Sequence, residues 1–128
     1  MPASVPRVRR LPIPQNASLI VRGDGLDEVV LRADAVRFHR RFEAWGRFGV
    51  SALLAVDDAE ITALCATRLE HFATVAILHR AELERRGIEV VPTFRTPHVT
   101  LAHPRLNALV TTLLACEHRV IENPYFER

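Results

Sequence analysis

The residues best suited to chemistry gather in one short stretch, which reads IEVVPTFRTPHVTLAHP from Ile88 to Pro104. Two strand-like runs, 88–94 and 98–102, are separated there by an Arg-Thr-Pro turn. Alternation along the second run places His98 and Thr100 on one face of a strand and apolar residues on the other. An imidazole exchanges protons near neutral pH, so the polar face predicts acid–base chemistry beside a buried face.

The segment His98-Val-Thr100 resembles one copy of the H-x-T motif of the two-histidine phosphoesterases. In that family two such motifs act on a 2′,3′-cyclic phosphate or a related RNA end, with one histidine as base and the other as acid. The resemblance implies metal-independent RNA cleavage in which His98 moves the proton while Thr100 and Arg95 hold the phosphate. The family needs a second H-x-[ST] copy elsewhere in the chain, and the residues at His39, His71 and His79 do not supply one. A half-site could still act by pairing His98 with Arg95 or His103. The alternative is a strand whose polar face meets solvent or a protein partner.

A second set of candidates is Arg22, Ser51 and Glu122, in the segments LIVRGD, GVSAL and RVIENP. Their order resembles the arginine–serine–glutamate signature of the ADP-ribosyltransferase fold. The resemblance implies NAD as cofactor, with Arg22 on the nucleotide, Ser51 lining the pocket and Glu122 stabilising the sugar cation as nicotinamide leaves. Ala52 and Val120 depart from the family, which usually has Ser-Thr-Ser and often a second acid. The alternative is that the three residues have no shared function. Arg22 is then a cation at the end of a strand, Ser51 a hydrogen-bonded core hydroxyl and Glu122 an acid on the surface.

The positive charge of the sequence comes entirely from arginine. Lys and Arg together number 17, none of them is lysine, and the formal net charge is +2. Arginine binds phosphate and carboxylate groups through two parallel hydrogen bonds, although a GC-rich genome would produce the same bias. The charge therefore allows RNA, a nucleotide or an acidic protein as partner.

Several classes of protein are disfavoured. No apolar run approaches the roughly 18–20 residues that span a bilayer, so no membrane partner is expected. The first residues, MPASVPRVRRLPIPQ, lack an apolar secretion segment, which predicts a cytoplasmic protein. Cys65 and Cys116 lie in apolar helical patterns as reduced thiols, and no zinc-ligand spacing occurs, so no metal site is expected.

The predicted elements alternate along the chain. Strands are predicted at 18–22, 48–56, from 72 or 73 to 79, 88–94, 98–102 and 118–122, and helices from 24 or 27 to 45, at 57–70, at 81–86 and from Pro104 onward. This order, β-α-β-α-β-α-β-β-α-β, predicts an α/β or α+β domain over residues 18–128, with a compact mixed β-sheet flanked by about four helices. Residues 1–17 are rich in proline and arginine and predict an extended arm that packs through Val8, Leu11 and Ile13.

The first predicted helix has an apolar stripe and an arginine face. The stripe is expected to face the core and consists of Leu26, Val29, Val30, Ala33, Val36, Phe38, Phe42 and Trp45. The opposite face, either solvated or a binding surface, carries Arg32, Arg37, Arg40 and Arg41. Near the other end of the chain, Tyr125 and Phe126 could anchor a partner or a homo-oligomer.

Three functional hypotheses follow, and the first two share an analogy. Small, mildly basic single domains resemble the toxin halves of bacterial toxin–antitoxin pairs. The first hypothesis is a toxin-like enzyme that uses NAD for ADP-ribosyl transfer or NAD cleavage and is silenced by an acidic antitoxin-type partner. The second is a metal-independent RNA-cleaving toxin or phosphoesterase centred on His98 and Thr100. The third is a protein-interaction domain without catalysis.

Overall fold

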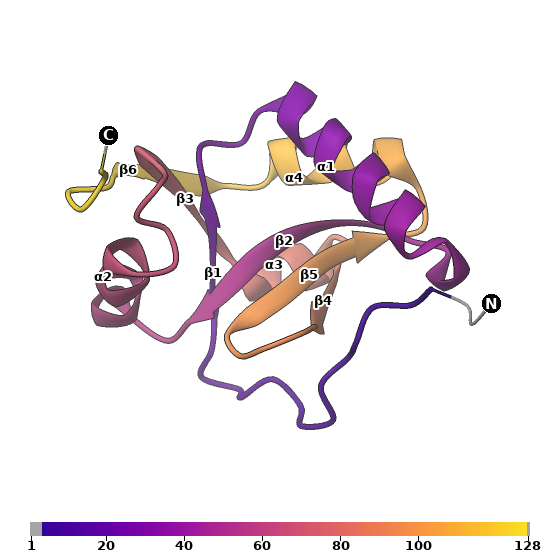
Figure 1. The fold of residues 1–128 in the computed structure, drawn as a ribbon, viewed down its shortest axis with the longest axis horizontal. Helices are drawn as coiled ribbons and strands as arrows, with labels where there is room; N and C mark the ends of the chain where they lie inside the picture. Colours follow the sequence, from indigo (N-terminus) through magenta and orange to yellow (C-terminus); the bar gives the residue numbers. More distant parts are fainter. Residues whose placement is uncertain (1–3, 128) are drawn as a thin grey trace.

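A computed structural model describes residues 4–127, so Met1–Ala3 of the predicted arm and Arg128 lie outside the described residues. The strands are β1 (Leu19–Gly23), β2 (Phe48–Ala55), β3 (Thr74–His79), β4 (Glu89–Pro92), β5 (His98–His103) and β6 (His118–Glu122). The helices are α1 (Glu28–Arg41), α2 (Asp58–Ala66), α3 (Arg80–Arg85) and α4 (Leu106–Ala115), with a 3-10 turn, η1 (Glu43–Trp45), after α1. The predicted order of strands and helices is confirmed, and the fold is mixed α+β (Figure 1).

The six strands form one sheet in the order β4-β5-β2-β1-β3-β6. All five strand pairings are antiparallel, so the predicted mixed sheet is antiparallel instead. The physical reason is the connection of β1 to β2 through α1, which returns the chain beside β1 in the opposite direction. The strand β1 therefore lies between β2 and β3, while β4 and β6 form the two edges.

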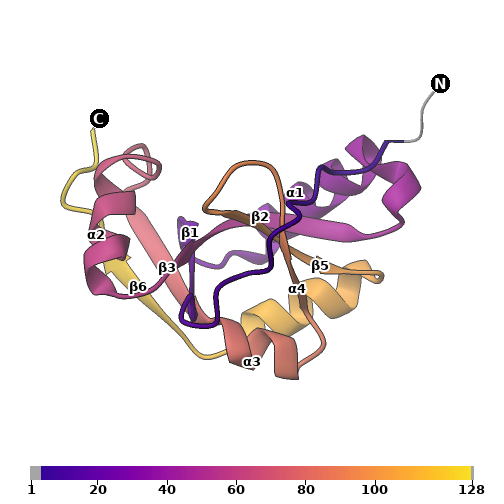
Figure 2. The same ribbon diagram turned by 90° about the horizontal axis from the view of Figure 1, so that it is seen from below.

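Alternation along the central strands builds a core on each face of the sheet. Ile20 pairs with Leu54 and Leu78, and these residues pack with α1, α3 and α4 in one apolar cluster. The next residue, Val21, pairs with Leu53 and Ile77, which pack with α2 in a second cluster. The separation of α2 from the other helices is visible in Figure 2. Period-two alternation with both faces covered explains why these strands read as nearly continuous apolar runs.

The buried side of α1 differs from the predicted stripe. Leu31 and Ala35 are its buried residues, whereas Val29 is 76% exposed and Val30 is 42% exposed. Asp27 caps the helix by accepting a hydrogen bond from the Val30 backbone N–H at 3.0 Å, which fixes where the first turn starts. The sequence pattern was ambiguous because apolar residues occur on both sides of this helix.

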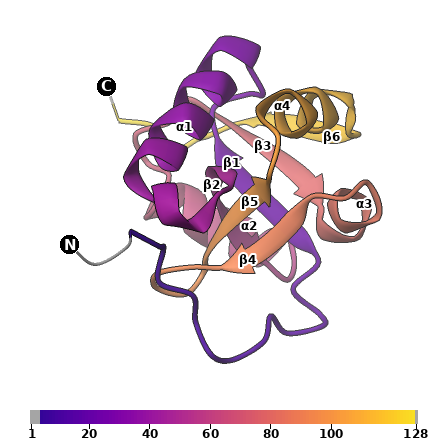
Figure 3. The same cartoon turned by 90° about the vertical axis from the view of Figure 1, so that its right-hand side faces the viewer.

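The N-terminal arm meets the end of the edge strand β4 through its backbone (Figure 3). Val8 forms a β-bridge with Thr93, the Arg9 N–H donates to the Pro92 carbonyl at 2.7 Å, and the Phe94 N–H donates to the Arg7 carbonyl at 2.9 Å. Ile13 packs on the core as predicted, but Val8 is 47% exposed and Leu11 is 81% exposed, so the arm is not held by those two side chains. The arm thus pairs with the end of this edge strand and satisfies backbone groups of residues 92–94.

Among residues 4–127, no helix has the combination of length and hydropathy that crossing a membrane requires. Cys65 and Cys116 are buried free thiols, as the sequence predicted.

Two neighbouring leucines of α4 test the assignment of the core. Leu113 is fully buried and Leu114 is 36% exposed. Leu113→Ala should lower the free energy of unfolding by about 2–5 kcal/mol because it leaves a cavity, whereas Leu114→Ala should change it by about 0.5 kcal/mol. Urea denaturation of both variants measures the difference, and equal losses would show that α4 packs through another face.

Candidate functional site

A cavity of about 430 Å³, here called the central cavity, opens between α1, the segment after α2 and the middle of the sheet. Its floor is formed by β1 and β2, its walls by α1 and by residues 68–72, and His98 of β5 also lines it. Gly23 lets one wall come close, because an added Cβ there would stand 2.5 Å from the Phe72 ring. The polar side chains that line the cavity are those of Arg22, Asp24, Asp34, Ser51, Arg68 and His98.

The His98 imidazole is held by a chain of buried hydroxyl groups. His98 Nδ1 lies 2.9 Å from Thr93 Oγ1, which lies 2.7 Å from Thr100 Oγ1. Thr93 and Thr100 are both fully buried. Among residues 4–127, Nδ1 is the only ring nitrogen of His98 that makes a hydrogen bond. The contact fixes the plane of the ring and leaves Nε2 available for a ligand.

The surroundings of His98 favour the neutral imidazole. Burial lowers the pKa of His98, and the positive charges of Arg68 and Arg9 lower it further. Arg9 is held nearby because its Nη1 donates to the carbonyls of Thr93 and His98, each at 2.7 Å. At neutral pH the ring is therefore a proton acceptor with two cations close by.

The three residues predicted to act with His98 have other roles or positions. Thr100 was predicted to hold a phosphate, but its fully buried hydroxyl can only support the ring through Thr93. Arg95 lies in the turn between β4 and β5 and lines a different hollow. His103, the other proposed partner, stands at the far end of β5, where its Nδ1 accepts from the Arg105 backbone N–H at 2.9 Å. Alternation along β5 places it on the opposite face from His98.

The cation that does share the cavity with His98 is Arg68. Among residues 4–127 this exposed arginine makes no ion pair. Sequence analysis did not select Arg68, because it belongs to no motif and falls in a segment that was predicted to be helix up to residue 70. In the structure α2 ends at Ala66, and the turn that follows carries Arg68 to the cavity wall. The one local signal was the β-branched Thr67, whose hydroxyl donates back to the Ala63 carbonyl at 2.7 Å.

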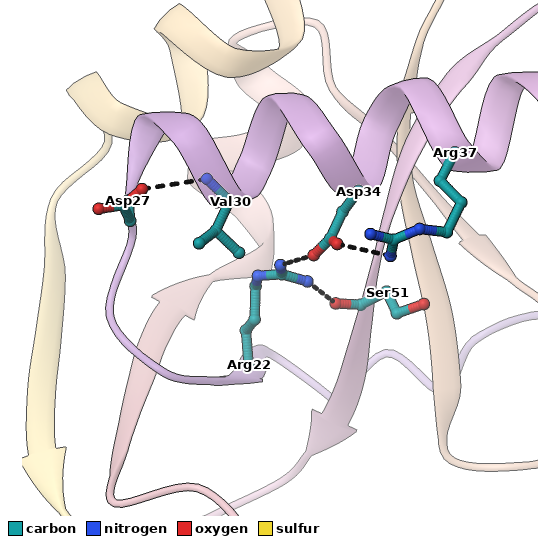
Figure 4. A network of polar contacts seen from close by, with 6 residues as sticks. All are labelled: Arg22, Asp27, Val30, Asp34, Arg37 and Ser51. Atoms are coloured by element: carbon teal, nitrogen blue, oxygen red, sulfur yellow. Dashed lines mark hydrogen bonds and ion pairs between the residues drawn. The ribbon is translucent and has the colours of Figure 1, made fainter.

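Arg22 joins three elements of the fold. It is 9% exposed, and its guanidinium pairs with Asp34 of α1 and donates to the Ser51 backbone carbonyl of β2 at 2.8 Å (Figure 4). Asp34 also pairs with Arg37 at 3.0 Å. The Ser51 hydroxyl points away from Arg22, so the two residues meet through the backbone of Ser51. Arg22 is therefore committed to holding α1 against the sheet.

Glu122 lies outside the central cavity. It is exposed at the end of the edge strand β6, opposite Thr74, and β3 separates β6 from β1. Arg22 is opposite Ala76, two residues further along β3. The strand order thus keeps the Glu122 carboxylate away from the Arg22 guanidinium, and these two groups do not face each other across one cavity.

No protein-family model, curated protein or solved structure matches this chain. The chemistry of the site therefore has to be judged from its own residues.

Removal of the Asp34 carboxylate tests whether Arg22 is structural. Asp34→Ala leaves a buried guanidinium without its counter-charge, so the free energy of unfolding should fall by about 3 kcal/mol. Arg37→Ala removes the exposed partner of the same carboxylate and should cost about 0–1 kcal/mol. Chemical denaturation gives both values, and a small effect of Asp34→Ala would mean that Arg22 is not held by this pair.

The lowered pKa of His98 determines the sign of a pH effect on stability. In the unfolded chain the imidazole takes up a proton near a pKa of about 6.5, whereas the folded protein protonates it only at lower pH. Stability from this group is complete above pH about 6.5 and is lost as the pH falls through the folded pKa. The His98→Asn variant should therefore lose less stability than the unchanged protein between about pH 7 and pH 5. Identical pH profiles in denaturation experiments would contradict the assignment.

Proposed function

We propose that this protein is a metal-independent phosphoesterase that cleaves RNA, with His98 as its general base. The observation that supports the proposal is the meeting of two groups at one cavity: the half-buried, hydroxyl-oriented imidazole of His98 and the guanidinium of Arg68, which makes no ion pair among residues 4–127. A neutral imidazole accepts a proton near neutral pH, and a guanidinium binds phosphate oxygens.

The proposed reaction uses the 2′-hydroxyl of the RNA as its nucleophile. His98 Nε2 accepts the proton of that hydroxyl while its oxygen attacks the adjacent phosphorus. The bond from phosphorus to the 5′-oxygen then breaks, which gives a 2′,3′-cyclic phosphate, and the departing oxygen takes a proton from the imidazolium or from water. Arg68 would stabilise the negative charge that builds on the phosphate oxygens, a contribution that grows in a water-poor site. Nδ1 would donate to Thr93 Oγ1 and so keep Nε2 free of its proton at the start.

The NAD hypothesis is supported less well by the geometry. Two terminal nitrogens of Arg22 already contact Asp34 and the Ser51 carbonyl, so a pyrophosphate would have to displace a buried partner. Glu122, the proposed acid, lies at the sheet edge. Release of nicotinamide from NAD nevertheless remains a useful comparison reaction, because it uses none of the His98 chemistry.

A toxin role fits the proposed reaction, since uncontrolled RNA cleavage stops growth. The formal net charge of +2 would suit silencing by an acidic protein partner. If the protein is such a toxin, growth arrest on its expression should require His98, as RNA cleavage does.

Substitution of His98 is the direct test of the proposed function. His98→Asn should slow cleavage of an end-labelled RNA by roughly 10²–10⁴-fold, because the base is removed. His103→Asn, on the same strand but outside the cavity, should cleave at the unchanged rate. Gel analysis in the presence of EDTA, with detection of the cyclic phosphate, measures both rates. Undiminished cleavage by His98→Asn, or nicotinamide release that depends on Glu122, would overturn the proposal.

A further inference from the structure

Two more hollows continue from the central cavity in a row. The first, of about 280 Å³, shares Asp34 and Ser51 with the central cavity and is also lined by Arg37, Arg41 and Phe94. The second, of about 580 Å³, shares Phe94 with the first and is lined by the arm and the β4–β5 turn. The shared residues place the three hollows side by side, and together they are here called the arginine groove.

The arginine groove is rich in cations that lack acidic partners. Arg37 and Arg41 line its first hollow, and Arg7, Arg10 and Arg95 line its second. The acid that lines these two hollows, Asp34, is already paired with Arg22 and Arg37. Within residues 4–127, no ion pair involves Arg7, Arg10, Arg41 or Arg95.

The arginines of α3 show the opposite behaviour. Arg80 pairs with Glu84, and both Arg85 and Arg86 pair with Glu82. Positive charge is thus available to an external anion along the arginine groove, whereas it is largely cancelled on α3.

Phe94 stands where the two outer hollows meet, and its backbone is strained. Its φ is 58°, a left-handed conformation that bulky residues rarely adopt. The N–H of Phe94 is fixed by the Arg7 carbonyl, and its ring lies 5.1 Å from the His98 ring and 5.9 Å from the Phe42 ring, centre to centre. This conformation holds a half-buried aromatic ring between two groups of arginines.

We propose that the arginine groove binds single-stranded RNA, with one base stacked on Phe94 and the flanking phosphates on the arginines to either side. A positive channel interrupted by an aromatic ring is the arrangement that non-sequence-specific single-strand binding uses. A duplex would keep its bases stacked on each other, so it could not use Phe94. The direction of the groove, which leads to the cavity of His98, rests on the proposed function; the binding itself does not.

The charge contribution is tested on His98→Asn protein, which keeps the RNA intact during the measurement. Fluorescence anisotropy with a labelled oligouridine should show at least tenfold weaker binding when Arg7, Arg10 and Arg95 are all changed to Gln. The slope of log affinity against log salt should decrease in magnitude by about 2, since each single-strand phosphate contact contributes about 0.7. Changing Arg85, Arg86 and Arg119 to Gln removes the same charge from other surfaces and should leave both quantities nearly unchanged.

The stacking contribution is tested at Phe94 with a substitution that suits its backbone. Asn tolerates the left-handed conformation, so Phe94→Asn should fold normally while it weakens oligouridine binding roughly tenfold. Phe94→Tyr retains a ring and should bind like the unchanged residue. An RNA duplex and a DNA single strand of equal length serve as competitors, and the single strands should compete better than the duplex.

Clear results would overturn the inference. Equal binding by the two triple variants, or a duplex that competes as well as a single strand, would exclude it. If polyglutamate competes as well as oligouridine, and if its binding is unchanged by Phe94→Asn, the groove is a surface for an acidic protein instead. If oligouridine binds tightly and in a Phe94-dependent way but the unchanged protein cleaves no RNA, the proposed binding groove is supported and the phosphoesterase proposal is wrong.

Discussion

The hydroxyl chain from Thr100 through Thr93 to His98 is the contact on which the site depends. Both threonines are buried, and both come from the paired strands β4 and β5 or their immediate ends, so the register of that pair sets the position of the ring. A buried hydroxyl without a partner would be unfavourable, which makes the three groups mutually dependent. The N-terminal arm reinforces these contacts, because the Arg9 guanidinium donates to the backbone carbonyls of Thr93 and His98. The orientation of one imidazole thus rests on short-range contacts within the β4–β5 hairpin and on the long-range contacts of Arg9.

Two arginines at the central cavity differ because their surroundings differ. Arg22 is buried against a carboxylate and a carbonyl, so its charge is used to hold α1 on the sheet. Arg68 is exposed at a turn, with no ion pair among residues 4–127, so its charge is available to a ligand. Arg68 also lowers the pKa of His98 together with burial and Arg9, which keeps the imidazole neutral beside a site that attracts anions. In the proposed reaction the same cation would therefore serve the phosphate and the base.

The sequence predicted the elements well and the site only in part. Alternation and the turn residues located all six strands, because buried strands have a local signature. The direction of neighbouring strands and the buried side of α1 were not predictable, since both depend on packing between distant segments. His98 was found from its position on a strand, and its supporting Thr93 lies just across the hairpin turn but was not selected. Arg68 comes from a segment that reaches the cavity only through tertiary packing. Glu122 was selected from residue order alone, and the strand order places it at an edge.

The protonation of one ring nitrogen decides most directly whether His98 can be a base. NMR of protein with ¹⁵N-labelled histidine distinguishes a proton on Nδ1 from one on Nε2 and follows both through a pH titration. The expected result at neutral pH is a neutral His98 ring with its proton on Nδ1, a pKa below the ordinary value of about 6.5, and an Nε2 signal that shifts when a non-cleavable dinucleotide is added. A proton on Nε2 at neutral pH, or an Nε2 signal that does not shift when the dinucleotide is added, would contradict general-base catalysis by His98.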